Sequence, residues 1–234
     1  MSLQSETNEA AQALFRMLSS TPEQEPDPDP VKTPAGPRHV LAKHGWGDRY
    51  INPIELRGDQ WLEAFEIAKP VVSLGGILAL VGGRGPGKTQ MAAELARGGD
   101  WPEDSRQFTG GDVVLSHRRQ TALYRRAMDI FLDLRHAKKA HVKSSEKEEL
   151  AKLEAVGLLV IDEFQEKGEL EWERWAMKNL IDKRYSSSRP TIIIANYTRK
   201  ELFDEIGESI VNRAQENGKS IEFTWESFRG KTKP

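Results

Sequence analysis

The feature that most constrains the fold is a glycine-rich segment between an apolar run and a helical pattern. Residues 77–81 are apolar and predict a buried strand, and residues 89–97 have helical spacing. The segment between them fits G-x-x-x-x-G-K-[ST], in which backbone N–H groups surround phosphate oxygens at a helix start. An ordinary glycine turn is the alternative, but the flanking strand and helix favour phosphate binding. We therefore predict that ATP is bound by Gly82, Gly83, Arg84, Gly85, Pro86, Gly87, Lys88, Thr89 and Gln90.

Four side chains in and after this loop are predicted to serve hydrolysis. Lys88 would reach the β- and γ-phosphates, and the Thr89 hydroxyl would ligate Mg²⁺. A second apolar run, residues 158–161, is followed by Asp162 and Glu163. Ligands bind at the carboxyl ends of strands in open α/β sheets. We expect Asp162 to hold Mg²⁺, directly or through water, and Glu163 to be the general base for the attacking water. A surface turn with two solvated acids is the alternative.

Two polar residues later in the chain are further candidates. Asn196 ends the apolar run 191–195, where its amide could orient water against the γ-phosphate or simply cap a turn. Arg213 lies in an expected helix at 208–217. It could reach a neighbouring subunit's γ-phosphate as an arginine finger, or form an ordinary surface salt bridge. The residues alone leave both choices open.

The rest of the pattern alternates short apolar strands with helices. This alternation predicts an α/β fold with a mostly parallel sheet covered on both faces. Besides the three runs above, strands are expected at 113–116 and 220–224, and helices at 60–69, 121–139, 147–155, 169–185 and 200–206.

The N-terminal part differs in composition from the rest. Residues 1–20 carry an amphipathic pattern, with Leu14 and Leu18 on one helical face. Residues 21–37 are rich in proline, which forbids helix and favours extended chain. We predict a partner-binding helix at 1–20, a linker at 21–37 and an ATPase domain at 38–234. A helix packed on its own domain, or a frayed terminus, is the alternative for 1–20.

Basic residues outnumber acids in the segment 117–143. Contacts of such residues with phosphates position a nucleic acid without reading its sequence. A solvated helix face, balanced by the acids that follow, is the alternative. We predict DNA contacts from Arg118, Arg119, Arg125, Arg126, Lys138 and Lys139.

The composition excludes several other classes of protein. No apolar run approaches the roughly 18 residues that a membrane span needs, and residues 1–11 carry no secretory pattern. The chain has no cysteine, which excludes disulfides and cysteine-ligated zinc and fits a reducing compartment. We expect a cytoplasmic protein without membrane contact.

The motifs, taken in order, resemble those of AAA+ ATPases. Within that class they are similar to the DnaC-type replicative helicase loaders and the IstB-type transposition ATPases. The resemblance covers roughly 45–231, and its more specific parts are 46–50, 184–191 leading to Asn196, 207–213 and 223–229.

This resemblance implies a five-stranded sheet in the order 5-1-4-3-2 without a C-terminal lid domain. It also implies ATP at the interfaces of a ring or spiral of identical subunits, with Arg213 acting in trans and Arg184 a weaker candidate for that interface. We expect an Mg²⁺-dependent ATPase that loads a replicative helicase onto single-stranded DNA. One alternative is an IstB-type helper that binds duplex DNA and a transposase. Another is a nucleotide-gated adaptor with negligible turnover.

Overall fold

The computed structural model describes residues 41, 44–51, 58–98, 122–137, 145–166 and 170–228. All of them belong to the compact unit Pro37–Pro234. The predicted helix at 1–20, the linker at 21–37 and the predicted strand at 113–116 lie outside the described residues. Four of the predicted DNA contacts also lie outside them, namely Arg118, Arg119, Lys138 and Lys139.

The described strands form one parallel sheet in the order β2-β3-β4-β1-β5. Read from the other edge this is 5-1-4-3-2, so the predicted topology is confirmed. Residues of β3 are buried without interruption, because helices cover both faces of the sheet and neither face meets water. The strands are β1 (Ile77–Gly82), β2 (Ala122–Arg126), β3 (Leu158–Asp162), β4 (Thr191–Ile194) and β5 (Lys219–Phe223).

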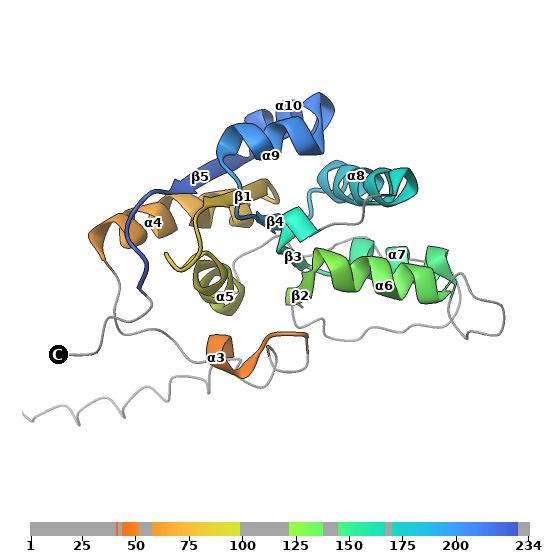
Figure 1. Ribbon diagram of the computed structural model, residues 1–234, viewed down its shortest axis with the longest axis horizontal. Coiled ribbons are helices and arrows are strands. Elements are labelled where there is room, and N and C mark those ends of the chain that lie inside the picture. Colours follow the sequence, from red (N-terminus) through yellow and green to blue (C-terminus); the bar gives the residue numbers. More distant parts are fainter. Residues whose placement is uncertain are drawn as a thin grey trace, which may run out of the picture. The chain divides into compact units, whose positions relative to one another are not determined.

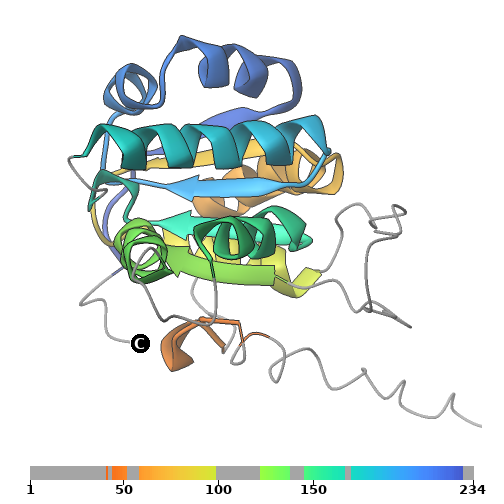
Figure 2. The same cartoon turned by 90° about the vertical axis from the view of Figure 1, so that its right-hand side faces the viewer.

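Two groups of helices cover the two faces of this sheet (Figures 1 and 2). Alternate strand residues point to opposite faces. Leu78 and Leu80 therefore pack with α4 and α5 on one face, whereas Ile77 and Ala79 pack with the helices on the other face. One face carries α4 (Asp59–Ser73) and α5 (Lys88–Gly98), and the other carries α6 (Ala127–Ala137), α7 (Glu146–Ala155), α8 (Glu171–Ser186), α9 (Arg199–Ile206) and α10 (Glu208–Asn217).

No helix among the described residues is long and apolar enough to cross a membrane.

The helix predicted at 121–139 is wrong in its first part. Residues 122–126 form β2, and helix α6 begins only at Ala127. Pairing with β3, which sets Ala122 opposite Leu158, outweighs the helical spacing of the apolar residues. Arg125 and Arg126 therefore lie at the end of a strand and not on a basic helix.

Residues 44–50, the edge strap, cover the β2 edge of the sheet. The Tyr124 backbone N–H donates to the His44 carbonyl (2.9 Å), and the Trp46 indole donates to the Ala122 carbonyl (3.2 Å). Gly45 has φ 86°, and a Cβ there would lie 2.4 Å from the Tyr124 carbonyl oxygen. The strap thus satisfies backbone groups that an open sheet edge would expose. Its last residues belong to the short helix α3 (Asp48–Ile51).

Arg184 is a buried cation that ties together the ends of several elements. Its side chain is 0% exposed. It donates to the Thr191 hydroxyl (2.9 Å) and to the carbonyls of Leu153 (2.8 Å), Val156 (2.9 Å) and Pro190 (2.7 Å). Burial lowers the pKa of Arg184 to about 9, which still leaves it charged at neutral pH. The prediction of Arg184 as an interface residue is wrong, because its donors are used inside the subunit.

We expect Arg184→Met to lower the free energy of unfolding by about 3 kcal/mol or more, because buried carbonyls lose their donors. Urea unfolding followed by circular dichroism measures this change. The matched control is Lys183→Met, which removes an ion pair with Glu154 from a side chain that is 51% exposed. This control should cost less than about 1 kcal/mol. Equal losses in the two variants would contradict the role given to Arg184.

Candidate nucleotide-binding site

A cavity of about 790 Å³ lies where β1, β3 and β4 end. Ligands of open α/β sheets bind at this place, outside the carboxyl ends of the strands. Gly82, which ends β1, and Gly83 and Pro86 of the following loop are not among the lining residues. The predicted site residues that line the cavity are Arg84, Gly85, Gly87, Lys88, Thr89, Gln90, Asp162, Glu163 and Asn196.

The loop between β1 and α5 is held from outside. Gly87 has φ 96°, and a Cβ there would lie 2.9 Å from the Trp61 indole nitrogen, so glycine is required. The carbonyls of residues 86 and 87 accept hydrogen bonds from the indole groups of two tryptophans. Because C=O and N–H point in opposite directions in a trans peptide, the N–H groups that follow these carbonyls point away from the indoles. Those groups belong to Gly87 and Lys88, which line the cavity. The donors are Phe228 N–H to the Gly85 carbonyl (3.1 Å), the Trp225 indole to the Pro86 carbonyl (3.0 Å) and the Trp61 indole to the Gly87 carbonyl (3.3 Å).

Lys88 and Asn196 are brought together at this loop. Lys88 is 5% exposed, and its ammonium donates to the carbonyls of Gly82 (2.8 Å) and Gly83 (2.5 Å) and to the Asn196 amide oxygen (3.1 Å). The Asn196 backbone N–H donates to the Gln165 side chain (3.0 Å), which links the end of β4 to the short helix η1 (Phe164–Glu166). An ammonium surrounded by oxygen acceptors suits a phosphate, which offers more of the same acceptor type.

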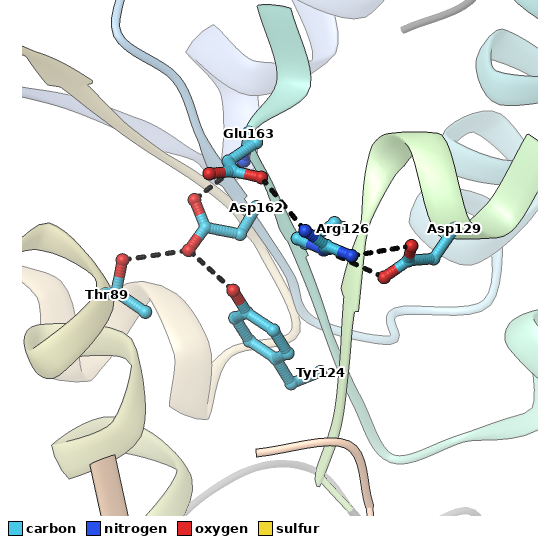
Figure 3. Close-up of polar contacts among 6 residues, drawn as sticks. All are labelled: Thr89, Tyr124, Arg126, Asp129, Asp162 and Glu163. Atoms are coloured by element: carbon cyan, nitrogen blue, oxygen red, sulfur yellow. Dashed lines mark hydrogen bonds and ion pairs between the residues drawn. The ribbon is translucent and has the colours of Figure 1, made fainter. Parts of the chain in front are cut away.

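Asp162 accepts hydrogen bonds on both carboxylate oxygens (Figure 3). Its Oδ2 accepts from the Thr89 hydroxyl (2.8 Å) and from the Tyr124 hydroxyl (2.9 Å). Its Oδ1 accepts from the Glu163 backbone N–H (2.7 Å). Burial raises the pKa of Tyr124, and the charge of Asp162 raises it further, so the phenol stays a neutral donor. The two residues predicted to hold a metal ion, Thr89 and Asp162, therefore lie in contact.

The donor set fits Mg²⁺ carried by a nucleotide. Hydroxyl and carboxylate oxygens are the hard ligands that Mg²⁺ prefers. Within the described ranges, no group of three or more His, Cys, Asp or Glu side chains could hold a metal ion by itself. An ion next to Thr89 and Asp162 would therefore need phosphate and water oxygens as well, which is the usual habit of Mg²⁺.

Glu163 lies at the rim of the cavity in a strained conformation. Its φ is 52°, a left-handed backbone that costs a non-glycine residue about 1–3 kcal/mol and is typical of functional sites. Burial raises the pKa of Glu163, with further increases from Glu166 and Asp162, and Arg126 opposes them. The Arg126 guanidinium lies 4.0 Å from the Glu163 carboxylate.

Arg126 is turned toward acidic side chains. It donates to both carboxylate oxygens of Asp129, at 2.9 and 3.0 Å, and neighbours Glu163 (Figure 3). The structure thus places this predicted DNA contact beside the nucleotide cavity. Arg125, another predicted DNA contact, lies next to Arg126 on β2.

Arg213 lies away from this cavity in its own subunit. It forms an ion pair with Asp182 of α8, and its guanidinium lies over the Tyr185 ring, 5.5 Å from the centroid. It is not among the residues that line the cavity.

Tyr124, Trp61 and Trp225 take part in the site, although the phosphate-loop and acidic-strand motifs do not include them. Tyr124 falls in the stretch interpreted as helix, so its position beside Asp162 was hidden; the short apolar run 122–124 was the available signal. Trp225 lies in 223–229, one of the segments that resemble the helicase loaders. Its contact with Pro86 spans 139 residues of sequence and depends on closure of the whole fold.

The sequence of this chain is similar to that of known helicase loaders. No protein-family model matches the chain. A stretch of 89 residues is 34% identical to the replicative helicase loader DnaC of Escherichia coli strain K12. The stretch covers 38% of this chain and 36% of that protein, so the chain matches about a third of the relative's length.

Solved structures extend the similarity over the fold. The crystal structure of the DnaC helicase loader has a TM-score of 0.56 at 19% identity, covering 75% of this chain and 99% of that chain. AMPPCP-bound DnaA from Aquifex aeolicus has a TM-score of 0.54 at 19% identity, covering 71% of this chain and 47% of that one. The resemblance to DnaC-type helicase loaders is thereby confirmed, and the chain has the AAA+ P-loop fold.

Proposed function

We propose that this protein is an Mg²⁺-dependent ATPase that loads a replicative helicase onto single-stranded DNA. The observation that carries the ATPase part is the convergence of Lys88, the Thr89–Asp162 pair and Asn196 on one cavity. The loader part is supported by the sequence similarity to DnaC. It rests on a partial match, and the partner and DNA are therefore part of the proposal.

The loop would bind the phosphates of ATP through backbone N–H groups and Lys88. The N–H groups of Gly87 and Lys88 are already directed by the carbonyl contacts with Trp225 and Trp61. A preorganised loop binds more tightly because it loses less conformational freedom on binding. Lys88 would exchange its carbonyl acceptors for phosphate oxygens while keeping an ammonium close to Asn196.

Hydrolysis would depend on positioning and charge stabilisation. A water attacks the γ-phosphorus, its proton passes to the Glu163 carboxylate, and the bond between the γ-phosphorus and the β-bridging oxygen breaks. The raised pKa of Glu163 favours this proton transfer, because a base works best when its pKa lies nearer the working pH. Mg²⁺, held by Thr89 and Asp162, would supply neutralisation of the developing charge. Asn196 would orient the water against the γ-phosphate.

A neighbouring subunit would complete the site. Arg213 is turned away from its own cavity, so an arginine finger from this position acts only in trans. Arg213 would then leave its ion pair with Asp182. We infer a ring or spiral of identical subunits, with ATP at each interface.

The partners are assigned to other parts of the chain. Residues 1–20 would grip the helicase through their amphipathic face. Single-stranded DNA would run along the basic segment 117–143, through phosphate contacts that do not read sequence. An IstB-type transposition helper would share the ATPase residues and differ in these partners, and the named relatives favour the loader.

We expect Glu163→Gln to bind ATP with unchanged affinity and to lose turnover at least about 100-fold, because the amide cannot accept the proton of water. Equilibrium binding of ATP and steady-state phosphate release measure the two effects. The control is Glu171→Gln, a change at the exposed start of α8, which should leave both values unchanged. Wild-type turnover in Glu163→Gln would remove Glu163 from the mechanism.

The proposed partner is tested by capture from the native host. Full-length protein should retain the replicative helicase when ATP is present, and protein lacking residues 1–37 should not. Mass spectrometry of the bound fraction identifies the partner. A captured transposase would replace the loader by the transposition helper, and equal helicase capture by both forms would exclude residues 1–37 as the grip.

A further inference from the structure

Tyr124 is a polar side chain in the nucleotide cavity that the phosphate-loop and acidic-strand motifs do not include. Its hydroxyl donates to Asp162 Oδ2 at 2.9 Å, the same oxygen that accepts from the Thr89 hydroxyl at 2.8 Å (Figure 3). Figure 3 shows the phenol approaching Asp162 from β2, while Thr89 approaches from α5. Asp162 is therefore held between a neighbouring strand of the sheet and a helix that covers one face of the sheet.

The hydrogen bonds that Asp162 accepts limit the positions that its carboxylate can offer to a metal ion. An ionised carboxylate offers about four lone-pair positions, two on each oxygen. Thr89 and Tyr124 occupy both positions of Oδ2, and the Glu163 N–H occupies one of Oδ1. One position on Oδ1 is left for a metal ion or its bound water. Rotation of the carboxylate would break the hydrogen bond from Tyr124.

The pairing of the strands explains why Tyr124 can reach Asp162. Tyr124 is paired with Val160, and residues two apart on a strand share a face of the sheet. Tyr124, Val160 and Asp162 therefore point to the face covered by α5, and Thr89 lies in the first turn of that helix. Arg125, one residue later, points to the opposite face and cannot replace Tyr124.

The edge strap holds the Tyr124 ring in place. The Trp46 ring packs against it with a centroid distance of 4.9 Å and an interplanar angle of 40°. The backbone N–H of Tyr124 donates to His44, and the Trp46 indole donates to Ala122. A backbone hydrogen bond to Tyr124, an indole hydrogen bond to its strand and a ring contact thus fix the residue that in turn fixes Asp162.

We propose that Tyr124 is a positioning residue that orients Asp162 for the Mg²⁺ bound with the nucleotide. This inference rests on the proposed ATPase function. The hydroxyl performs the role and the ring supplies its position. Removing a group that orients a metal ligand typically weakens metal binding about 10- to 100-fold. Loss of the hydroxyl should therefore affect the metal ion and leave the phosphate loop intact.

The test is Tyr124→Phe in the full chain, with Mn²⁺ as a spectroscopic substitute for Mg²⁺. Electron paramagnetic resonance measures Mn²⁺ binding in the presence of ADP, and calorimetry measures ADP binding without divalent metal. We expect the Mn²⁺ dissociation constant to rise about ten-fold and the metal-free ADP affinity to stay unchanged. The matched control is Tyr185→Phe, which removes a phenol hydrogen bond to Glu216 on another part of the molecule. It should change neither value.

Each other outcome contradicts a different statement. Unchanged Mn²⁺ affinity in Tyr124→Phe, with normal ADP binding, would overturn the role of Tyr124 and leave the ATPase proposal standing. Equal weakening of Mn²⁺ binding and metal-free ADP binding would also overturn it, because the residue would then support the whole cavity. Absence of ADP binding by the unaltered protein would instead refute the proposed function itself.

Discussion

The parallel pairing of β1, β4 and β3 is the constraint on which the rest of this structure depends. Parallel strands end at the same edge of a sheet, so the groups that follow them meet there. Lys88 follows β1, Asn196 follows β4 and Asp162 ends β3, and β4 lies between the other two. The hydrogen bond from Lys88 to Asn196 joins groups 108 residues apart in sequence. Helices on both faces keep these strands buried, and thereby fix the geometry of the cavity.

The cavity is also supported by aromatic residues that lie outside the nucleotide-binding motifs. Trp61 and Trp225 hold two consecutive carbonyls of the phosphate loop, and Tyr124 holds the carboxylate of Asp162. These three aromatic residues come from α4, the segment after β5, and β2. Each combines an apolar ring that packs in or near the core with one polar atom directed at the site. The nucleotide site is therefore coupled to both edges of the sheet.

The resemblance to AAA+ ATPases implied the sheet order that the structure shows. The residues of the chain themselves predicted the strand-loop-helix at 77–97 and the acids after 158–161, because motif spacing and strand burial are local or nearly local properties. The helix predicted at 121–139 was wrong at β2. The apolar residues of that stretch suit a helix in isolation, but pairing with β3 makes residues 122–126 a strand. The prediction of Arg184 as an interface residue was wrong for a similar reason. A charged residue is ordinarily exposed, and only the fold shows the carbonyls that enclose this one. Tyr124 and Trp225 act through contacts that exist only after the chain has folded.

We propose that this cavity hydrolyses ATP and that single-stranded DNA stimulates the hydrolysis. Steady-state phosphate release by the full-length protein, with and without single-stranded DNA, tests it most directly. We predict measurable turnover that rises when single-stranded DNA is added and disappears in Lys88→Ala, since the ammonium is needed to hold the phosphates. Turnover no greater than that of Lys88→Ala under both conditions would contradict the claim. The protein would then be a nucleotide-gated adaptor and not an ATPase.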